Sequence, residues 1–341
     1  MDIVLEVVDT FVGDRIWASV LPAPHLQAGP GSNVTAPLIS WEYKPTSPRF
    51  YFEPSQYAYE SAWARDFVLR QAVSLFFITW VFGLFNYFFF STLSYLFIFD
   101  HDTLGHPKFL KNQIWLEIKQ ASLAMPGLSV CTTMTFLLEV RGYARLYDVT
   151  EEGPGLWYDY TQIFFFIMFT DFCIYWAHRW LHAPLVYKYL HKRHHKWIMP
   201  SPYASYAFHP LDGFVQSAPY HLYPLLFPMH KFVFVGAFIF VNFWTIAIHD
   251  GEYITDNPVI NGSACHTAHH LFFNYNYGQF TTLWDRLGGS YRKPDVAWFN
   301  KQTKKSKETL AAGIKEMEQI QKEVEGDSDD RTYIDLGKKK N

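Results

Sequence analysis

Residues Ala72 to Phe99 read AVSLFFITWVFGLFNYFFFSTLSYLFIF, an apolar run of 28 residues without a charged side chain. About 20 such residues are enough to cross the hydrocarbon core of a bilayer as a helix. Buried core helices of soluble proteins can imitate a short apolar segment, but not an uncharged run of 28 residues. The run therefore predicts an integral membrane protein, although the mean hydropathy of the whole chain is near neutral at -0.07.

Further apolar regions follow along the chain. Ala121–Leu138 holds 18 uncharged residues, and Tyr160–Ala177 holds another 18 that are interrupted only by Asp171. The last region consists of 17 uncharged residues, Phe232–Ile248, preceded by the shorter stretch Phe214–Pro228. The aromatic content of 19% is typical of membrane and interfacial proteins. These patterns predict an all-α membrane protein with about four transmembrane helices, in which the last apolar region is a hairpin.

The charges between the spans predict the orientation. The segment from Arg179 to Lys196 carries five basic residues and no acid, so the positive-inside tendency places it in the cytosol. The loop from Glu139 to Asp159 has two basic residues against five acids, which favours the opposite side. If the last apolar region enters the membrane and returns, the histidine-rich segments described next all lie on the cytosolic face.

Composition divides the chain into three parts. Residues 1–65 are an N-terminal extension rich in Pro, Gly and Ser, which we expect to be lumenal and less ordered. Residues 66–298 form the membrane domain. Residues 299–341 form a charged cytosolic tail, in which Lys301 to Gly326 is expected to be a mostly solvated helix that rests on the domain or on the membrane surface.

Two short signals at the ends agree with this arrangement. Asn33-Val34-Thr35 is a glycosylation sequon, which is consistent with a lumenal N-terminus. The last residues, Lys338 to Asn341, resemble the dilysine retrieval signal of endoplasmic reticulum membrane proteins. A charged chain end often has no such role, and tripeptide sequons are common by chance.

Eight of the 15 histidines fall into three short motifs. The motifs are His178 with His182, then His191 with His194 and His195, then His266 with His269 and His270. Residues three or four apart share one face of a helix, so each motif can present two or three imidazoles together. A lone histidine in an apolar setting is usually an ordinary core residue, but three such motifs favour metal binding. Neutral imidazole binds iron and zinc alike. Eight ligands exceed what one ion accepts, so the motifs predict a two-metal site.

The sequence contains no motif for a nucleotide cofactor and no sign of a disulfide framework or of nucleic-acid binding. No Gly-rich dinucleotide fingerprint, P-loop or Gly-x-Ser-x-Gly elbow is present, so we expect no bound nicotinamide or flavin and an external source of electrons. Three cysteines are too few and too scattered for a disulfide framework. A net charge of -3 gives no nucleic-acid footprint.

The order of the three motifs among membrane segments resembles the fatty acid hydroxylase superfamily of membrane di-iron oxygenases. Within that superfamily, the chain is most similar to the fungal sterol C-5 desaturases, also called lathosterol oxidases, over about residues 65 to 298. The runs that carry the narrower resemblance are His106 to Gln113, Phe208 to Gly213, Pro219 to His221, and His249 to Gly251.

The resemblance implies an enzyme with two iron ions that uses dioxygen to introduce the C5–C6 double bond into a Δ7-sterol of the episterol or lathosterol type, in ergosterol-type sterol biosynthesis. Zinc has no redox chemistry and would not serve. The family draws electrons from NADH through cytochrome b5 and its reductase and works in the endoplasmic reticulum membrane, in contact with membrane lipid. Two alternatives stay open: another oxidase of the superfamily, such as a sterol methyl oxidase or a fatty acyl hydroxylase, and a non-catalytic zinc-holding membrane scaffold.

The candidate site extends beyond the eight histidines of the motifs. His249 is the preferred ninth ligand, because it ends the last span at the membrane boundary. His209 and His221 lie in family-like runs and are possible outer-sphere or substrate-side groups. Asp171 is the one acid inside a predicted span, and it lies seven residues before His178 on the same helix face. It is expected either to hydrogen-bond a ligand imidazole or to pair with a polar neighbour between helices. No catalytic residue outside the metal site is predicted.

Overall fold

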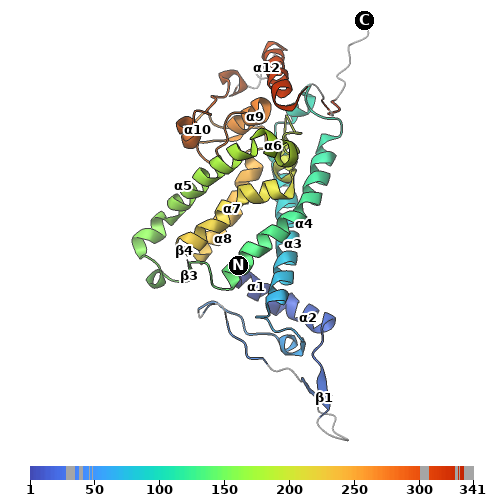
Figure 1. Cartoon of the computed structure of the whole chain (residues 1–341), viewed down its shortest axis with the longest axis vertical. Coiled ribbons are helices and arrows are strands. Elements are labelled where there is room, and N and C mark those ends of the chain that lie inside the picture. The colour runs from blue at the N-terminus through green and yellow to red at the C-terminus, as the bar shows by residue number, and fades with distance from the viewer. Residues whose placement is uncertain are drawn as a thin grey trace. The chain divides into compact units, whose positions relative to one another are not determined.

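A computed structural model of the chain describes residues 1–27, 35–37, 41–45, 47, 49–299, 307–326, 329 and 331–333. Figure 1 shows a chain built almost entirely of helices. Strand in the described residues is limited to two short pairs. β1 (His25–Gln27) and β2 (Thr35–Pro37) are antiparallel, and β3 (Leu146–Tyr147) and β4 (Met229–His230) are parallel. The prediction of an all-α protein is confirmed.

Among the described residues, three helices are long and apolar enough to cross a membrane: α3 (Val68–Phe97), α4 (Gln113–Val140) and α5 (Leu156–Leu181). At about 1.5 Å per residue, even the shortest of them is about 39 Å long, which exceeds the roughly 30 Å hydrocarbon core. Their outward side chains are apolar, as shown by Phe97, which is 80% exposed. Each helix contains one of the predicted apolar runs nearly whole. The chain is a multi-pass membrane protein.

The last apolar region folds as two shorter helices, α7 (Pro210–Leu226) and α8 (Lys231–Ala247), with four residues between them. The ring of His221, five residues before the end of α7, lies 5.6 Å from the ring of Phe238, seven residues after the start of α8. Contact between two residues that are each more than one turn away from the connection means that the second helix folds back along the first. The predicted hairpin is confirmed as a fold. Each arm is about 26 Å long, short for a complete crossing.

The chain divides into two compact units, and each is described separately. The first contains Met1–Phe82, Ser129–Tyr160 and Pro224–Val235. Its N-terminal part is more regular than composition suggested, because α1 (Asp2–Val8), a π-helical turn (Asp9–Gly13) and α2 (Asp14–Val20) follow one another without a break. The first 20 residues contain no proline and one glycine, so the Pro- and Gly-rich average came from residues further along.

Buried ion pairs hold this first unit together. Asp14 binds Arg65 at 2.6 Å and Arg70 at 2.7 Å, with all three side chains almost fully buried. Removing one partner of such a buried pair costs about 3–5 kcal/mol, because the other charge is left unpaired. Asn33 and Val34 of the sequon lie outside the described residues.

The second unit contains Gly83–Leu128, Thr161–Tyr223 and Gly236–Asn341. Besides parts of the spans and the hairpin, the described residues of this unit include four short or amphipathic helices. These are α6 (Pro184–Val186), α9 (Ser263–Phe272), α10 (Leu283–Leu287) and α12 (Lys307–Glu325). Gly127 of α4 lies against the first residue of α7, because a Cβ built on Gly127 would come within 2.8 Å of the Pro210 ring. Any larger residue at 127 would push the two helices apart.

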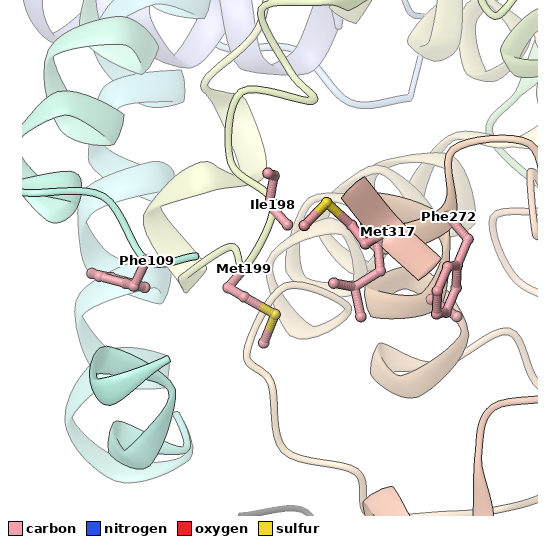
Figure 2. Close-up of a cluster of buried hydrophobic side chains, with 7 residues drawn as sticks. Phe109, Ile198, Met199, Phe272 and Met317 are labelled. Atoms are coloured by element: carbon pink, nitrogen blue, oxygen red, sulfur yellow. The ribbon is translucent and has the colours of Figure 1, made fainter. Parts of the chain in front are cut away.

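An apolar cluster joins α9 to the tail helix (Figure 2). Figure 2 shows Ile198, Met199, Phe272 and Met317 gathered in this cluster, with Phe109 beside them. Met317 of α12 is fully buried there, and Ile320 packs against it. The predicted tail helix is therefore confirmed over Lys307–Glu325, and it rests on the protein through its apolar stripe. Residues 301–306 lie outside the described residues. The side chain of Leu310, the first residue of that stripe, and the lysines near the C-terminus lie outside the described residues.

Candidate metal centre

The three histidine motifs are carried by different kinds of backbone. His178 lies in the last turn of α5, and the His182 N–H still bonds the His178 carbonyl at 3.2 Å, which continues the helical spacing. The second motif begins at the end of a π-helical turn, Tyr187–His191, and continues into irregular turns. The third motif occupies α9, whose residues from Ala264 to Phe272 are all buried.

Nine histidines converge in two groups, and within each group one ring nitrogen per residue lies within 4.8 Å of every other. The first group is His178, His182, His191, His195 and His269; the second is His194, His249, His266 and His270. All nine are the predicted ligands, including His249, which does not belong to any motif. His194 and His195 are neighbours in sequence but belong to different groups, and the same is true of His269 and His270. The reason is that adjacent side chains leave the backbone in different directions.

Several of these imidazoles have a fixed tautomer. A carbonyl or carboxylate oxygen only accepts, so the ring nitrogen that faces it must carry the proton. In each of four histidines, Nδ1 donates to such an oxygen and leaves Nε2 as a bare lone pair. The pairs are His178 with the Tyr277 carbonyl at 3.0 Å, His191 with Asp212 at 2.9 Å, His249 with the Thr245 carbonyl at 2.7 Å, and His269 with the Tyr275 carbonyl at 2.7 Å.

Two of the bare lone pairs face each other. Nε2 of His178 and Nε2 of His191 are 3.1 Å apart, although neither carries a proton to share. Similar distances occur in the second group, where His266 Nε2 is 3.0 Å from His249 Nε2 and 3.2 Å from His270 Nε2. Two nitrogens bound at right angles to one ion, with bonds of about 2.1 Å, are about 3.0 Å apart. The spacing fits ligands that share a cation.

Other buried ring nitrogens have no hydrogen-bond partner among the described residues. They are both nitrogens of His182 and of His195, Nδ1 of His194 and of His270, and Nε2 of His269. Each unsatisfied buried polar group costs about 1–3 kcal/mol. Burial away from water also lowers the pKa of His249 to about 4 and that of His269 to about 3. These histidines are therefore neutral at pH 7, the form in which imidazole binds a metal. The residues present fit a metal centre.

Comparison with known proteins agrees with this geometry. Residues 163–290 match the fatty acid hydroxylase family, described as "Fatty acid hydroxylase". The "Probable Delta(7)-sterol 5(6)-desaturase" of Neurospora crassa is 60% identical over 336 residues, which cover 98% of this chain and 97% of the relative. The chain belongs to the Delta(7)-sterol 5(6)-desaturase family. Its relatives of that name in Leptosphaeria maculans and Saccharomyces cerevisiae are 54% and 48% identical, and each alignment covers 98% of this chain and 97% of the relative. No solved structure matches the chain significantly.

In this desaturase-family chain, Asp212 is a site residue that the sequence analysis missed. It lies in the first turn of α7, its side chain is fully buried, and it holds the Nδ1 proton of His191. Gln216 in turn donates to its other oxygen at 2.8 Å. One signal pointed to it, because Asp212 is the only acid between Asp171 and Asp250.

The expectation that Asp171 hydrogen-bonds a ligand imidazole is wrong. Its carboxylate accepts the backbone N–H groups of Gln279, Phe280 and Thr281 at 2.8–3.1 Å, and the Thr281 hydroxyl at 2.6 Å. These four bonds use both oxygens. Asp171 therefore contacts the histidines only indirectly. It holds the backbone at 279–281, which closely follows Tyr275 and Tyr277, and the carbonyls of those two tyrosines orient His269 and His178. This is close to the alternative expectation of an acid paired with polar neighbours.

The other two expected outer groups lie outside both histidine groups. Nδ1 of His209 accepts the N–H of Leu211 at 3.2 Å, a local bond at the start of α7. His221 is buried in the middle of the hairpin beside Phe238. An outer-sphere or substrate-side role for these two residues stays a prediction.

Proposed function

We propose that this chain is a Delta(7)-sterol 5(6)-desaturase, which introduces a C5–C6 double bond into a Δ7-sterol with dioxygen as the oxidant. The sterol gives up two hydrogens, an external donor gives two electrons, and with two protons from water the dioxygen is reduced to two molecules of water. The observation that carries the proposal is the pair of facing lone pairs on His178 and His191, set among nine converging histidines, eight of them buried, in a chain of this family.

We further propose that the nine histidines hold two iron ions, one in each group. Bound iron supplies the redox chemistry with dioxygen that zinc lacks. The protein's part is to bring one ring nitrogen of each imidazole to one of the two sites. The carbonyls of Thr245, Tyr275 and Tyr277 and the carboxylate of Asp212 fix four of the rings. Outer contacts of this kind orient metal ligands and raise their basicity.

The proposed setting is the endoplasmic reticulum membrane, with residues 1–65 in the lumen, the membrane domain at 66–298, and the tail from 299 in the cytosol. The basic segment from Arg179 to Lys196 supports this orientation through the positive-inside tendency. Electrons would then come from NADH through cytochrome b5 and its reductase on the cytosolic face, where the histidine motifs are expected.

The test supplies membranes containing the protein with a Δ7-sterol, NADH, dioxygen, cytochrome b5 and its reductase. The expected product is the Δ5,7-diene, whose conjugated ultraviolet absorption distinguishes it from the substrate. An alcohol or an oxidised methyl group in place of the diene would assign the chain to another oxidase of the superfamily. Zinc in place of iron in the purified protein, together with no oxidised product, would favour the scaffold.

A further inference from the structure

Arg331, beyond the tail helix, is buried against the second histidine motif. Its side chain is 1% exposed, and its Nη2 donates to the His195 carbonyl at 2.9 Å, while Nε donates to the Lys196 carbonyl at 3.2 Å. Its Nη1 and Nη2 also bind the two oxygens of Glu325 at 2.7 and 3.1 Å. From the sequence this region was expected to be a solvated tail, and a single arginine there gave no signal.

The partner of Arg331 is tied to the same motif. Glu325, the last residue of α12, also accepts the hydroxyl of Tyr187 at 2.8 Å. The Tyr187 ring lies 5.6 Å from the His182 ring and 5.7 Å from the His195 ring, measured between centroids. Arg331 and Glu325 therefore contact the ligand segment through its backbone on one side and through a packed aromatic ring on the other.

The chain next to Arg331 is anchored at a second place. The N–H of Lys111 donates to the Thr332 carbonyl at 3.0 Å, and Leu110 forms an antiparallel bridge with Tyr333. We call Glu325, Arg331, Thr332 and Tyr333 the C-terminal clasp. The clasp is attached both to the segment before α4 and to α12. The position of Arg331, which donates to the His195 and Lys196 carbonyls, is therefore fixed from two sides.

The backbone that Arg331 holds controls both histidine groups. His194 belongs to one group and His195 to the other, so a rotation of the chain at 195 moves ligands of both. This stretch follows a π-helical turn and has no regular helix to fix its carbonyls. A guanidinium presents its donors in a planar fork, so it can fix two successive carbonyls and a carboxylate together.

We propose that Arg331 is a positioning residue for the metal centre, which fixes the backbone at His195 and Lys196 and so aims His194 and His195 into their two groups. This inference rests on the proposed metal-binding role of the histidines. On this proposal the C-terminal clasp helps to position the ligands of the metal centre.

The test uses the full-length protein, purified from membranes with its metal, and four variants. Arg331→Gln removes the charge and most of the fork, and Arg331→Lys keeps the charge without the fork. Glu325→Gln weakens the buried pair. Glu316→Gln is the matched control, because Glu316 lies on the same helix and pairs with Arg292 in an exposed position, with side chains 48% and 28% exposed.

Four quantities are measured: metal per protein, the rate of metal loss to a chelator, kcat, and KM for the sterol. We expect Arg331→Gln to lose metal about 10–100-fold faster than wild type, the range typical of outer contacts to metal ligands. Its kcat should fall while KM for the sterol stays unchanged, because the proposal has Arg331 act on the backbone at 195 and 196 and not on the sterol. Arg331→Lys and Glu325→Gln should be intermediate, and Glu316→Gln should match wild type.

A wild-type rate of metal loss in Arg331→Gln would overturn the proposal. Equally fast metal loss in Glu325→Gln and in the control Glu316→Gln would also overturn it, because it would indicate general loosening of the tail. If Arg331→Gln does not accumulate, Arg331→Lys decides, and a wild-type rate in that variant overturns the proposal. Wild-type protein that holds metal but forms no diene would refute the desaturase activity alone, because the metal-loss comparison needs no sterol. Wild-type protein without metal would overturn both.

Discussion

Replacing Asp212 tests how the protein orients one metal ligand. The Asp212 carboxylate and the His191 ring are fully buried and 2.9 Å apart. In Asp212→Ala the Nδ1 proton of His191 loses its acceptor in a fully buried site. An unsatisfied buried donor costs about 1–3 kcal/mol, and about 1.4 kcal/mol corresponds to a tenfold change. The expected loss of metal affinity is therefore about 5- to 150-fold, which overlaps the roughly 10–100-fold range for outer contacts.

The assay measures iron per protein across a chelator series, alongside diene formation in membranes. Asp212→Asn keeps an oxygen that can accept the proton but loses the charge, so its loss should be smaller than that of Asp212→Ala. Asp256→Asn makes the same chemical change at an exposed position and serves as the control. Unchanged iron affinity and turnover in Asp212→Ala would show that the hydrogen bond does not orient His191, and the reasoning would fail.

Three further predictions follow from the same contacts. His249→Ala should lower both metal content and turnover, measured on purified protein, as should alanine at any histidine of the motifs; full occupancy in His249→Ala would remove it from the ligand set. Asp171→Asn should keep the metal, but its thermal stability should fall and its turnover should drop about tenfold, because an amide cannot accept all of the N–H groups of 279–281. Wild-type stability and turnover would show that these hydrogen bonds are dispensable. In sealed membranes, impermeant labelling should reach Lys192 and the tail helix from the same side, and labelling from opposite sides would refute the hairpin topology.

The nine histidines could be predicted because their identity and spacing carry most of the information. Metal ligands must be of a few residue types, and a helix places i, i+3 and i+4 together whatever surrounds it. His249 followed from its place at the end of an apolar run. How the ligands divide between the two groups could not be predicted, because the separation of His194 from His195 depends on irregular backbone after a π-helical turn.

The outer contacts were harder to predict because they obey no periodicity. Asp212 lies 21 residues from the ring that it holds, and only its isolation among uncharged residues marked it. The sequence placed Asp171 on the same helix face as His178. A shared face does not reveal which atoms lie opposite the carboxylate, and these are the backbone N–H groups of 279–281 and not an imidazole. Arg331 is further removed still, since 136 residues separate it from His195.

These outer contacts matter because the imidazoles converge at an energetic cost, which the proposed metal ions would offset. Buried ring nitrogens without partners, and lone pairs facing each other at 3.1 Å, oppose the convergence of the imidazoles. A domain is stable by only about 5–15 kcal/mol, and each unsatisfied group costs about 1–3 kcal/mol, so the rings would turn away unless something else held them. Asp212, the carbonyls of Tyr275 and Tyr277, and the clasp at Arg331 each hold a ligand ring or its backbone in place. Buried long-range contacts therefore lie around the histidines, where the proposed metal binding would be coupled to folding.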